Sequence, residues 1–260
     1  MSDTIYIGWD VGAWHCDSSK TTAKSNDAFA VILPRDMSGT PSTSRGNFSI
    51  NLLQCGDSKK LIDAIFYFCG IKEPPLSKVI LAIDAPLGFP KIFRELLLQY
   101  EPCKPFGSAE LKTMKGQSRH NTFLYRETER QLFERGFEPK SAVGDRLGSH
   151  ATKAMYALHA CKLQLNKKLK GSWKDNEGHL TVIEVYPTVL RTSDEVSKKV
   201  DSYISAGLSR DEEDALYCAC AAELFDKSPD LFKPPPNDVD DAEGWIWAPD
   251  DARQSNKSSG

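Results

Sequence analysis

Hydrophobic and polar positions alternate over three short stretches near the start of the chain, a pattern typical of β-strands. The first stretch covers residues 4–10 (TIYIGWD), and two more follow at 27–34 (DAFAVILP) and 46–53 (GNFSINLL). The segment between the last two is rich in Ser, Thr, Gly and Pro, which indicates a turn. We therefore expect three strands in succession, with Asp10 at the carboxyl end of the first.

Two later stretches predict strands that also end at acidic residues. Residues 78–84 (KVILAID) are the most apolar run of the chain, typical of a strand buried on both faces, and they end at Asp84. Residues 180–186 (LTVIEVY) predict a fifth strand, with Glu184 near its end and Pro187 terminating it. Acidic side chains thus follow the same placement in strands one, four and five.

Helical periodicity separates and follows these strands. Asp57 is placed to cap a helix over 57–69, and Ser209 with Glu212 forms a capping box for a helix that runs to about residue 225. Between the fourth and fifth strands, helical stretches are expected at about 91–99, 121–135 and 151–170.

Together these elements predict the α/β class. We expect a mixed five-stranded sheet in the order 3-2-1-4-5, with helices on both faces and a helical insertion at about 91–178 between strands four and five. Residues 1–228 should form one domain, followed by an acidic, Pro-rich tail over 229–260 that is partly disordered. Trp245 and Trp247 are the two tail residues with enough apolar surface to pack back on the domain.

Composition limits the class of protein and the compartment in which it is expected. A chain of 260 residues with 40% hydrophobic residues can bury a sizeable core. Its apolar runs are far shorter than the roughly 20 residues of a membrane span, so no membrane partner is expected. The seven cysteines show no C-x-x-C spacing, which favours a reduced cytoplasmic protein and gives no support to a zinc site.

The acidic residues suggest chemistry. If strands one and four are neighbours, Asp10 and Asp84 face one crevice, where two carboxylates repel unless a cation such as Mg²⁺ or Mn²⁺ neutralises them. Asp211 and Asp214 are three residues apart in a helix and can reach the same site. Four such carboxylates could hold two cations roughly 3.5–4 Å apart, the arrangement used in phosphodiester hydrolysis. The pattern predicts a nuclease, with Glu184 as a further metal ligand or a supporting acid.

Each acidic residue also has a simpler explanation. Asp10 and Asp84 can be ordinary turn residues, because aspartate often hydrogen-bonds the turn that follows it. Asp211 lies in the first helical turn, where the helix dipole favours an acid, and Glu184 can be the outward residue of a strand. Asp214 is the hardest to explain in this way, because its helix presents small residues that should pack on the sheet.

Positive charge is concentrated in the insertion. Residues 104–170 contain fourteen Lys or Arg and six Asp or Glu. An acid-lined site repels a phosphate backbone unless nearby cations compensate, so this segment should border the carboxylates and bind DNA or RNA without reading its sequence. The alternative is a solvated helical face. The candidates for phosphate contacts are Lys112, Lys115, Arg119, Arg126 and Arg130.

Five short motifs carry a family resemblance that covers about residues 4–226. They are GWDVG at 8–12, AIDAPLGFP at 82–90, YRETERQL at 125–132, IEVYPTVL at 183–190 and DEEDALYCACAA at 211–222. In this order they resemble the predicted RNase H-like nucleases of bacteria and archaea. The resemblance implies an RNase H-like fold, metal ligation by Asp10, Asp84, Asp211 and Asp214, and a family-specific insertion that contains Arg126.

The sequence differs from the family pattern in two respects, and two other functions are compatible with it. The loop after Asp10 is long for a first hairpin, and no lysine or histidine is obviously placed as a general acid or base. The D-V-G sequence at 10–12 also occurs in actin-like phosphotransferases, although the chain lacks their second Gly-rich phosphate loop. A non-catalytic module that keeps the fold and binds nucleic acid or protein is the third interpretation.

Overall fold

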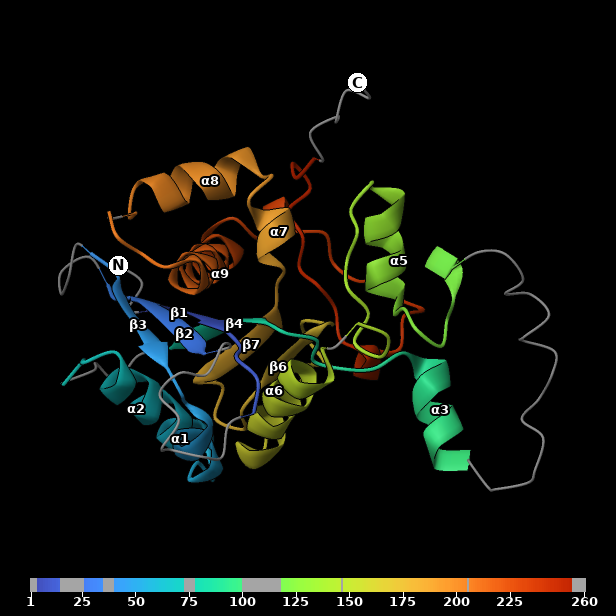
Figure 1. The fold of residues 1–260 in the computed structure, drawn as a ribbon, viewed down its shortest axis with the longest axis horizontal. Helices are drawn as coiled ribbons and strands as arrows, with labels where there is room; N and C mark the ends of the chain where they lie inside the picture. The colour runs from blue at the N-terminus through green and yellow to red at the C-terminus, as the bar shows by residue number, and fades with distance from the viewer. Residues whose placement is uncertain are drawn as a thin grey trace.

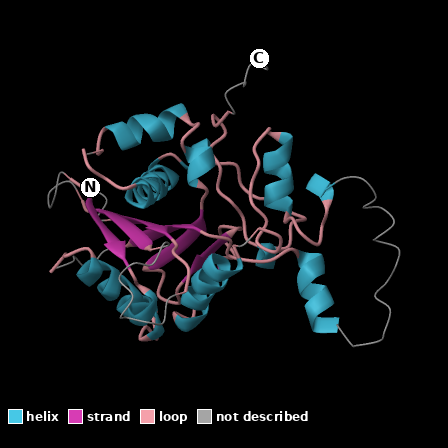
Figure 2. Cartoon of the chain, in the orientation of Figure 1, coloured by secondary structure: helices cyan, strands magenta, loops and turns pink. Residues whose placement is uncertain are grey.

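The computed structural model describes residues 4–14, 26–34, 40–72, 78–99, 118–145, 147–204 and 206–253. In this part of the chain a single mixed sheet has the strand order β3-β2-β1-β4-β7-β6-β5 (Figures 1 and 2). The expected α/β class is confirmed. The strands are β1 (Ile5–Asp10), β2 (Asp27–Ile32), β3 (Ser42–Gly46), β4 (Val79–Asp84), β5 (Gln164–Leu165), β6 (Ser172–Lys174) and β7 (Leu180–Glu184).

Helices cover both faces of this sheet. One layer contains α7, α8 and α9, the opposite layer contains α1, α2 and α6, and α3 and α5 lie to one side (Figure 1). The helices are α1 (Ser49–Leu53), α2 (Ser58–Phe68), α3 (Lys91–Gln99), α5 (Glu127–Glu134), α6 (Gly148–Ala160), α7 (Pro187–Leu190), α8 (Asp194–Asp201) and α9 (Arg210–Lys227).

The centre of the sheet follows the expected topology. Strand β1 pairs antiparallel with β2 and parallel with β4, and β4 pairs parallel with β7. The order 3-2-1-4-5 is therefore present, with β7 in the place of the fifth strand. The short strands β6 and β5 extend the sheet beyond β7, so the expected five-stranded sheet has two more strands than the sequence pattern predicted.

Alternation along β1 and β4 decides which side chains face α9. Ile5, Ile7 and Trp9 of β1 belong to the core on the α1, α2 and α6 side, whereas Tyr6 belongs to the core that contains α8 and α9. Because side chains alternate between faces, Gly8 and Asp10 follow Tyr6 onto the α9 face. The same period places Ile80, Ala82 and Asp84 of β4 there.

Gly8 permits unusually close packing between β1 and α9. A Cβ at this position would lie 1.9 Å from the Ala215 carbonyl oxygen and 2.4 Å from the Ala219 nitrogen. Both atoms belong to backbone, so they cannot turn aside as a side chain does. The glycine and the small residues of α9 therefore bring the helix directly onto the strand that ends at Asp10.

The third strand corrects the sequence prediction. Residues 46–53 were expected to form it, but the strand is the polar segment Ser42–Gly46, and Ser49–Leu53 form α1. Phe48 and Leu52 are buried four residues apart, which is a helical spacing. Strand β3 lies at the edge of the sheet and is largely half-exposed, so Ser, Thr and Arg are tolerated in it.

The insertion also differs in detail from the prediction. Helix α3 matches the predicted 91–99, whereas α5 begins only at Glu127 and α6 ends at Ala160. Residues expected to continue that helix to 170 instead form β5 and the turn to β6. The capping predictions are correct: Asp57 accepts a hydrogen bond from the Lys60 nitrogen, and Ser209 and Glu212 form the capping box of α9.

The chain after α9 packs on the domain as far as residue 253, and Trp245 and Trp247 dock there as the sequence allowed. Residues 254–260 of the expected tail lie outside the described residues. Phe232, Trp245 and Trp247 are buried in the α8 and α9 core. The backbone nitrogen of Trp247 donates to the Glu184 carbonyl at 2.9 Å, so this segment forms a short parallel bridge with the end of β7. Among the described helices, none is long and apolar enough to cross a membrane.

Candidate functional site

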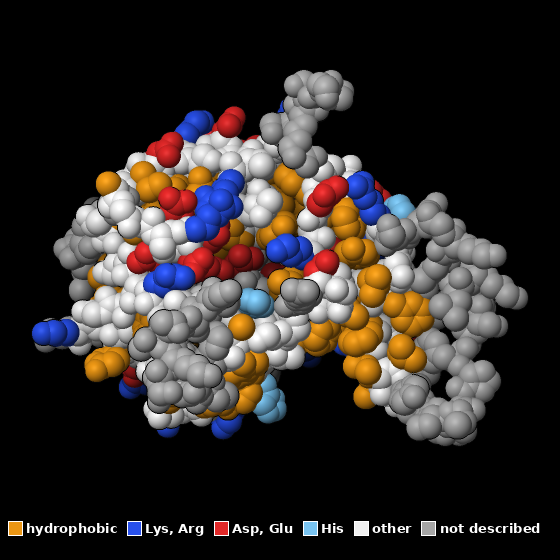
Figure 3. All heavy atoms as spheres, in the orientation of Figure 1, with side chains coloured by type: hydrophobic (Ala, Val, Ile, Leu, Met, Phe, Trp, Pro, Cys, Tyr) orange, Lys and Arg blue, Asp and Glu red, His pale blue; other side chains and the backbone are white. Residues whose placement is uncertain are grey.

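A cleft of about 360 Å³ opens at the carboxyl ends of β1 and β4. Its lining includes Asp10 and Asp84 from the two strands and Asp211 and Asp214 from the first turns of α9. Acidic side chains gather at the centre of the face shown in Figure 3. The structure thus brings together the four aspartates that the sequence singled out.

Asp10 and Asp84 are paired in register on neighbouring parallel strands. Burial, followed by the charge of Asp84, raises the pKa of Asp10 to about 9. Burial, followed by the charges of Asp214 and Glu184, raises the pKa of Asp84 to about 8. Among the residues that the structure describes, none donates a hydrogen bond or an ion pair to either carboxylate. In metal-free protein both carboxyl groups therefore keep their protons at neutral pH, and they can be ionised together only if a cation compensates the charge.

The two aspartates of α9 differ from this pair because arginines contact them. Arg191 lies 2.7 Å from an oxygen of Asp214, and Arg210 lies 3.7 Å from the other. Burial still raises the pKa of Asp214, although Arg191 acts in the opposite direction. Asp211 is bound by Arg45 of β3 at 2.7 Å and is more exposed. The carboxylates of Asp211 and Asp214 are thus both paired with an arginine.

The donor atoms of the cleft suit a hard divalent cation, because carboxylate oxygens are the preferred ligands of Mg²⁺ and Mn²⁺. The unpartnered carboxylates of Asp10 and Asp84 fit such an ion. In the described ranges, however, no three His, Cys, Asp or Glu side chains are grouped so that they could hold a metal ion together. The strand pair offers two ligands, while the expected ligands from α9 are engaged by arginine.

Glu184 has a different environment from the one expected of a metal ligand. Its two oxygens accept hydrogen bonds from the Arg126 guanidinium at 2.6 and 2.8 Å, and one of them also accepts from the Leu87 nitrogen at 2.9 Å. The side chain is buried. Glu184 lines the cleft with its charge already compensated by Arg126, which fits the supporting acid that the sequence also allowed better than it fits a metal ligand.

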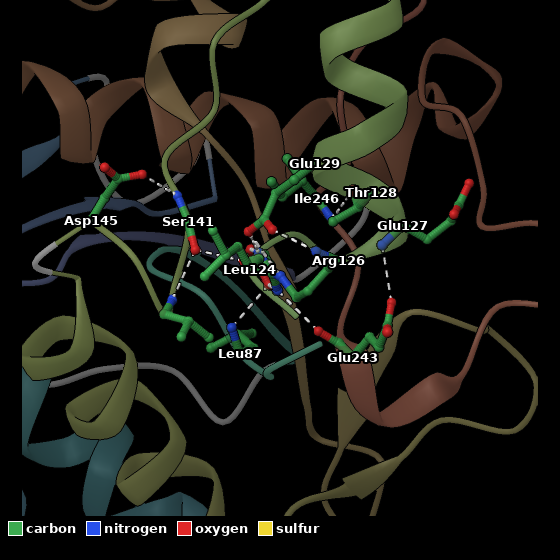
Figure 4. Close-up of polar contacts among 12 residues, drawn as sticks. Leu87, Leu124, Arg126, Glu127, Thr128, Glu129, Ser141, Asp145, Glu243 and Ile246 are labelled. Atoms are coloured by element: carbon green, nitrogen blue, oxygen red, sulfur yellow. Dashed lines mark hydrogen bonds and ion pairs between the residues drawn. The ribbon is translucent and has the colours of Figure 1, made fainter. Parts of the chain in front are cut away.

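Arg126 is buried beneath α5, which corrects the prediction that it contacts phosphate. Its guanidinium also pairs with Glu129 at 2.9 Å, and only 1% of its side chain is exposed. Burial alone would lower the pKa of Arg126, but Glu129 and Glu184 raise it above its usual value. One cation thus holds the carboxylates of Glu129 in α5 and Glu184 in β7. Figure 4 shows Arg126 beside Glu129 in this cluster.

The same cluster fastens the carboxyl-terminal segment to the insertion. The Glu243 carboxylate accepts from the backbone nitrogens of Lys91 and Glu127, at 2.6 and 3.0 Å, and so joins the beginnings of α3 and α5. Figure 4 shows Glu243 with Glu127. Arg126 donates to the Glu243 carbonyl at 3.0 Å. The role of the YRETE segment, which sequence reasoning left open, is therefore to tie three segments together beside the cleft.

Of the other basic candidates, the two that the structure describes do not line the cleft. Lys112 and Lys115 fall outside the described residues. Arg119 pairs with Glu138 at 2.9 Å on the surface, and Arg130 pairs with Glu127 one turn away on α5. Neither arginine is among the described residues that line the cleft.

Other cations reach the site, and sequence reasoning missed them. Lys140 lines the cleft on a turn in which the Ser141 hydroxyl donates to the Leu124 carbonyl at 2.6 Å (Figure 4). Arg191 arrives from the end of α7. The PTVLR sequence at 187–191 gave one usable signal, since a proline directly after a strand can begin a helix and so bring the next arginine back over the strand ends.

A second buried ion pair, between α6 and β2, lies near the cleft residues that follow Asp10. Lys153 of α6 lies 2.6 Å from Asp27 of β2, and both side chains are buried. Asp27 also accepts from the nitrogens of Trp9, Gly12 and Phe48, each at 3.0 Å. This pair fixes α6 to the strand next to β1 and holds the residues that follow Asp10.

No protein-family model, curated protein or solved structure matches the chain. The resemblance to RNase H-like nucleases therefore stays a prediction. It rests on the motifs of the sequence and on the arrangement of strands and carboxylates described above.

Proposed function

We propose that this protein is a divalent-metal-dependent nuclease with an RNase H-like fold, which hydrolyses phosphodiester bonds of DNA or RNA at the cleft between β1, β4 and α9. One observation carries the proposal. Asp10 and Asp84 end two adjacent parallel strands in register, and neither carboxylate has a partner among the described residues. Two such groups side by side need a cation to be ionised together.

The strand order supports the fold assignment. Three antiparallel strands, β3, β2 and β1, continue into the parallel strands β4 and β7, with α9 lying across β1, β2 and β4. Open α/β sheets place their ligand sites beyond the carboxyl ends of parallel strands. The cleft lies at this edge, and α9 supplies Asp211 and Asp214 from the side.

The residues divide the proposed chemistry as follows. Asp10 and Asp84 would hold Mg²⁺ or Mn²⁺, with Asp214 and then Asp211 completing the site from α9. When bound, such a cation polarises the phosphodiester and makes a coordinated water more acidic. Glu184, held by Arg126, keeps the end of β7 in place, and Lys140 contributes positive charge at the rim where a phosphate would enter.

Substrate binding should depend on charge and little on base sequence. Lys140 lines the cleft and Arg191 contacts Asp214. Arg119 and Arg130 are proposed to contact the backbone outside the cleft, and Lys112 and Lys115 of the same basic segment remain candidates for such contacts. Contacts of this type position a strand without reading its bases. Affinity should therefore fall steeply with salt.

A calorimetric titration of Mn²⁺ tests the proposal. The wild type should bind the ion, and Asp10→Asn and Asp84→Asn should each weaken binding at least tenfold. Asp63→Asn removes an exposed carboxylate of α2 and is the matched control, with affinity expected to stay within twofold. Wild-type protein that binds no Mn²⁺, or that binds equally well in all four proteins, would overturn the assignment.

A non-catalytic nucleic-acid-binding module is the second candidate. It is favoured by the observation that no three acidic, histidine or cysteine side chains of the described chain are grouped for metal binding. Cleavage of a labelled single-stranded oligonucleotide with Mn²⁺ separates the two functions. Binding without cleavage, and without any effect of Asp84→Asn, would support the binding module.

A further inference from the structure

Arg191 occupies a specific position between α7 and α9. It caps the carboxyl end of α7, four residues after Pro187, and its guanidinium lies over the Tyr217 ring at 4.4 Å. One terminal nitrogen contacts Asp214 at 2.7 Å and lies 3.6 Å from Glu213. The side chain is 22% exposed, so its charge is poorly screened by water.

Part of this guanidinium is unused. The Arg191 Nε is buried and has no hydrogen-bond partner among the residues that the structure describes. A buried donor without an acceptor is unfavourable, and arginine normally fills its planar fork of donors with two acceptors. The group is therefore held by Asp214, with Glu213 farther away, and by an aromatic face, while one of its donors has no acceptor among the described residues.

The acidic residues of the cleft fall into two classes around this arginine. Asp10 and Asp84 contact no cation of the described chain, whereas Asp214 is bound to Arg191. A cation between the strands and α9 would need Asp214 as its third ligand. The ion pair to Arg191 and the coordination of a metal ion thus compete for one carboxylate.

We infer that Arg191 couples metal binding to substrate binding. The inference rests on the proposed nuclease function. Without substrate, Arg191 holds Asp214 and opposes metal entry. When a phosphate of the nucleic acid takes over the Arg191 fork, Asp214 is released towards the metal position. Because coupling between two ligands is reciprocal, nucleic acid should raise metal affinity and metal should raise nucleic-acid affinity by the same factor.

This role requires arginine at the position. A lysine could neutralise Asp214 as a point charge, but it lacks the planar fork that stacks on Tyr217 and that can exchange a carboxylate for a phosphate. Arg191 is a positioning residue in this scheme, since it acts on the site through Asp214 and through the backbone of the substrate.

Calorimetry of Mn²⁺ binding, with and without a nuclease-resistant phosphorothioate oligonucleotide, tests the inference. In wild-type protein the oligonucleotide should raise Mn²⁺ affinity at least fivefold. Arg191→Gln should bind Mn²⁺ about three- to tenfold more tightly in the absence of oligonucleotide, since the competing charge is gone. The same substitution should weaken oligonucleotide binding and reduce the coupling factor towards one.

Two further variants keep the test decisive. Arg210→Gln removes a positive charge that also faces Asp214, but this side chain is 74% exposed and 3.7 Å away, so Mn²⁺ affinity should change less than twofold. Arg191→Lys retains the charge and should bind Mn²⁺ like wild type while losing most of the coupling. This variant also gives a readout if the glutamine variant does not fold.

The outcomes separate the two proposals. Wild-type binding of Mn²⁺ that Asp10→Asn abolishes, together with no change in Arg191→Gln, would overturn the coupling role and leave the nuclease proposal standing. Weaker Mn²⁺ binding in Arg191→Gln would overturn it as well. Absence of Mn²⁺ binding in the wild type would overturn the nuclease proposal and the coupling role together.

Discussion

Two groups of carboxylates lie at the same cleft, one paired with a buried arginine and the other without a cation from the described chain. Glu129 and Glu184 are buried and share one guanidinium, that of Arg126. Asp10 and Asp84 lie side by side at two strand ends without a cation from the described chain. Three of these four acids sit at or near the ends of strands or in the turn beside them, so their sequence positions alone do not separate the two groups.

The difference between the groups assigns them different roles. A carboxylate pair that is compensated by a buried arginine holds segments together, and removing the cation should damage the fold. A pair whose charges are left uncompensated lowers stability and is retained where a ligand supplies the missing charge. The Arg126 cluster is therefore the supporting structure of the cleft, and the aspartate pair is its chemical centre.

The largest effect is expected when the supporting cluster loses its cation. Arg126→Met leaves Glu129 and Glu184 buried without a cation, each keeping a backbone N–H donor, and should lower the free energy of unfolding by about 3–5 kcal/mol. Urea denaturation followed by circular dichroism measures it. The triple variant Arg126→Met, Glu129→Gln, Glu184→Gln should regain part of the loss. A loss below about 1 kcal/mol in the single variant would contradict the supporting role.

A smaller loss is expected at the second buried ion pair. Lys153→Met removes the cation of Asp27, but three backbone and side-chain N–H groups still donate to that carboxylate. The free energy of unfolding should therefore fall by only about 2–3 kcal/mol. Lys167→Met, at an exposed position, is the control and should change stability by less than 0.5 kcal/mol, roughly the usual size for surface sites. Equal losses in Lys153→Met and Arg126→Met would show that these hydrogen bonds do not support the charge of Asp27.

Removing a charge from the aspartate pair should raise the free energy of unfolding, whereas the two substitutions above lower it. In metal-free protein the folded state keeps a proton on Asp10 up to a pKa of about 9, whereas the unfolded chain releases it near its ordinary value of 3.8. Stability should therefore be fully present below about pH 4 and fall as the pH rises towards 9. Asp10→Asn should remove this dependence and be more stable than wild type by about 2 kcal/mol at pH 8.

Thermal denaturation in a chelator at pH 4 and pH 8 checks this prediction. The two proteins should differ little at the lower pH, and added Mn²⁺ should stabilise only the wild type. Asp10→Asn that is less stable than wild type at pH 8 would show that the carboxylate has a favourable partner, and the contrast with the Arg126 cluster would then fail.

The smallest effect on stability is expected at the surface arginines. Arg119 and Arg130 form ion pairs at the surface, so Arg119→Ala with Arg130→Ala should cost less than about 1 kcal/mol. If they contact phosphates, the double variant should flatten the salt dependence of duplex DNA binding by about 0.9 logarithmic units for each lost contact. An unchanged slope in a filter-binding titration would remove them from the nucleic-acid interface.

The sequence predicted the centre of the sheet because its strands carry a strong pattern. Residues 5–10 alternate and residues 79–84 form a nearly continuous apolar run, and both end in aspartate. The second pattern is that of a strand buried on both faces, which has few other interpretations. The convergence of Asp10, Asp84 and Asp214 followed from this pattern together with the small residues of α9. The third strand could not be predicted, because an edge strand that is half-exposed needs no apolar residues.

The support of the cleft could not be predicted, because it depends on contacts between distant segments. Arg126 and Glu184 are 58 positions apart, and in the sequence Arg126 looks like one more cation of a basic insertion. Glu243 looks like part of an acidic tail, yet its carboxylate joins α3 to α5. Charge composition describes an average over a segment, whereas pairing decides whether each individual charge faces solvent or protein.

Gly8 has a consequence for how the protein tolerates mutation. Gly8, two residues before Asp10, faces the backbone of α9 at Ala215 and Ala219. Ala215 directly follows Asp214 in the sequence. Even one added methyl group would push the helix outward and change the spacing between its aspartates and those of the strands. In a saturation mutagenesis screen, Gly8 should therefore be as intolerant as the acidic residues, although it carries no functional group at all.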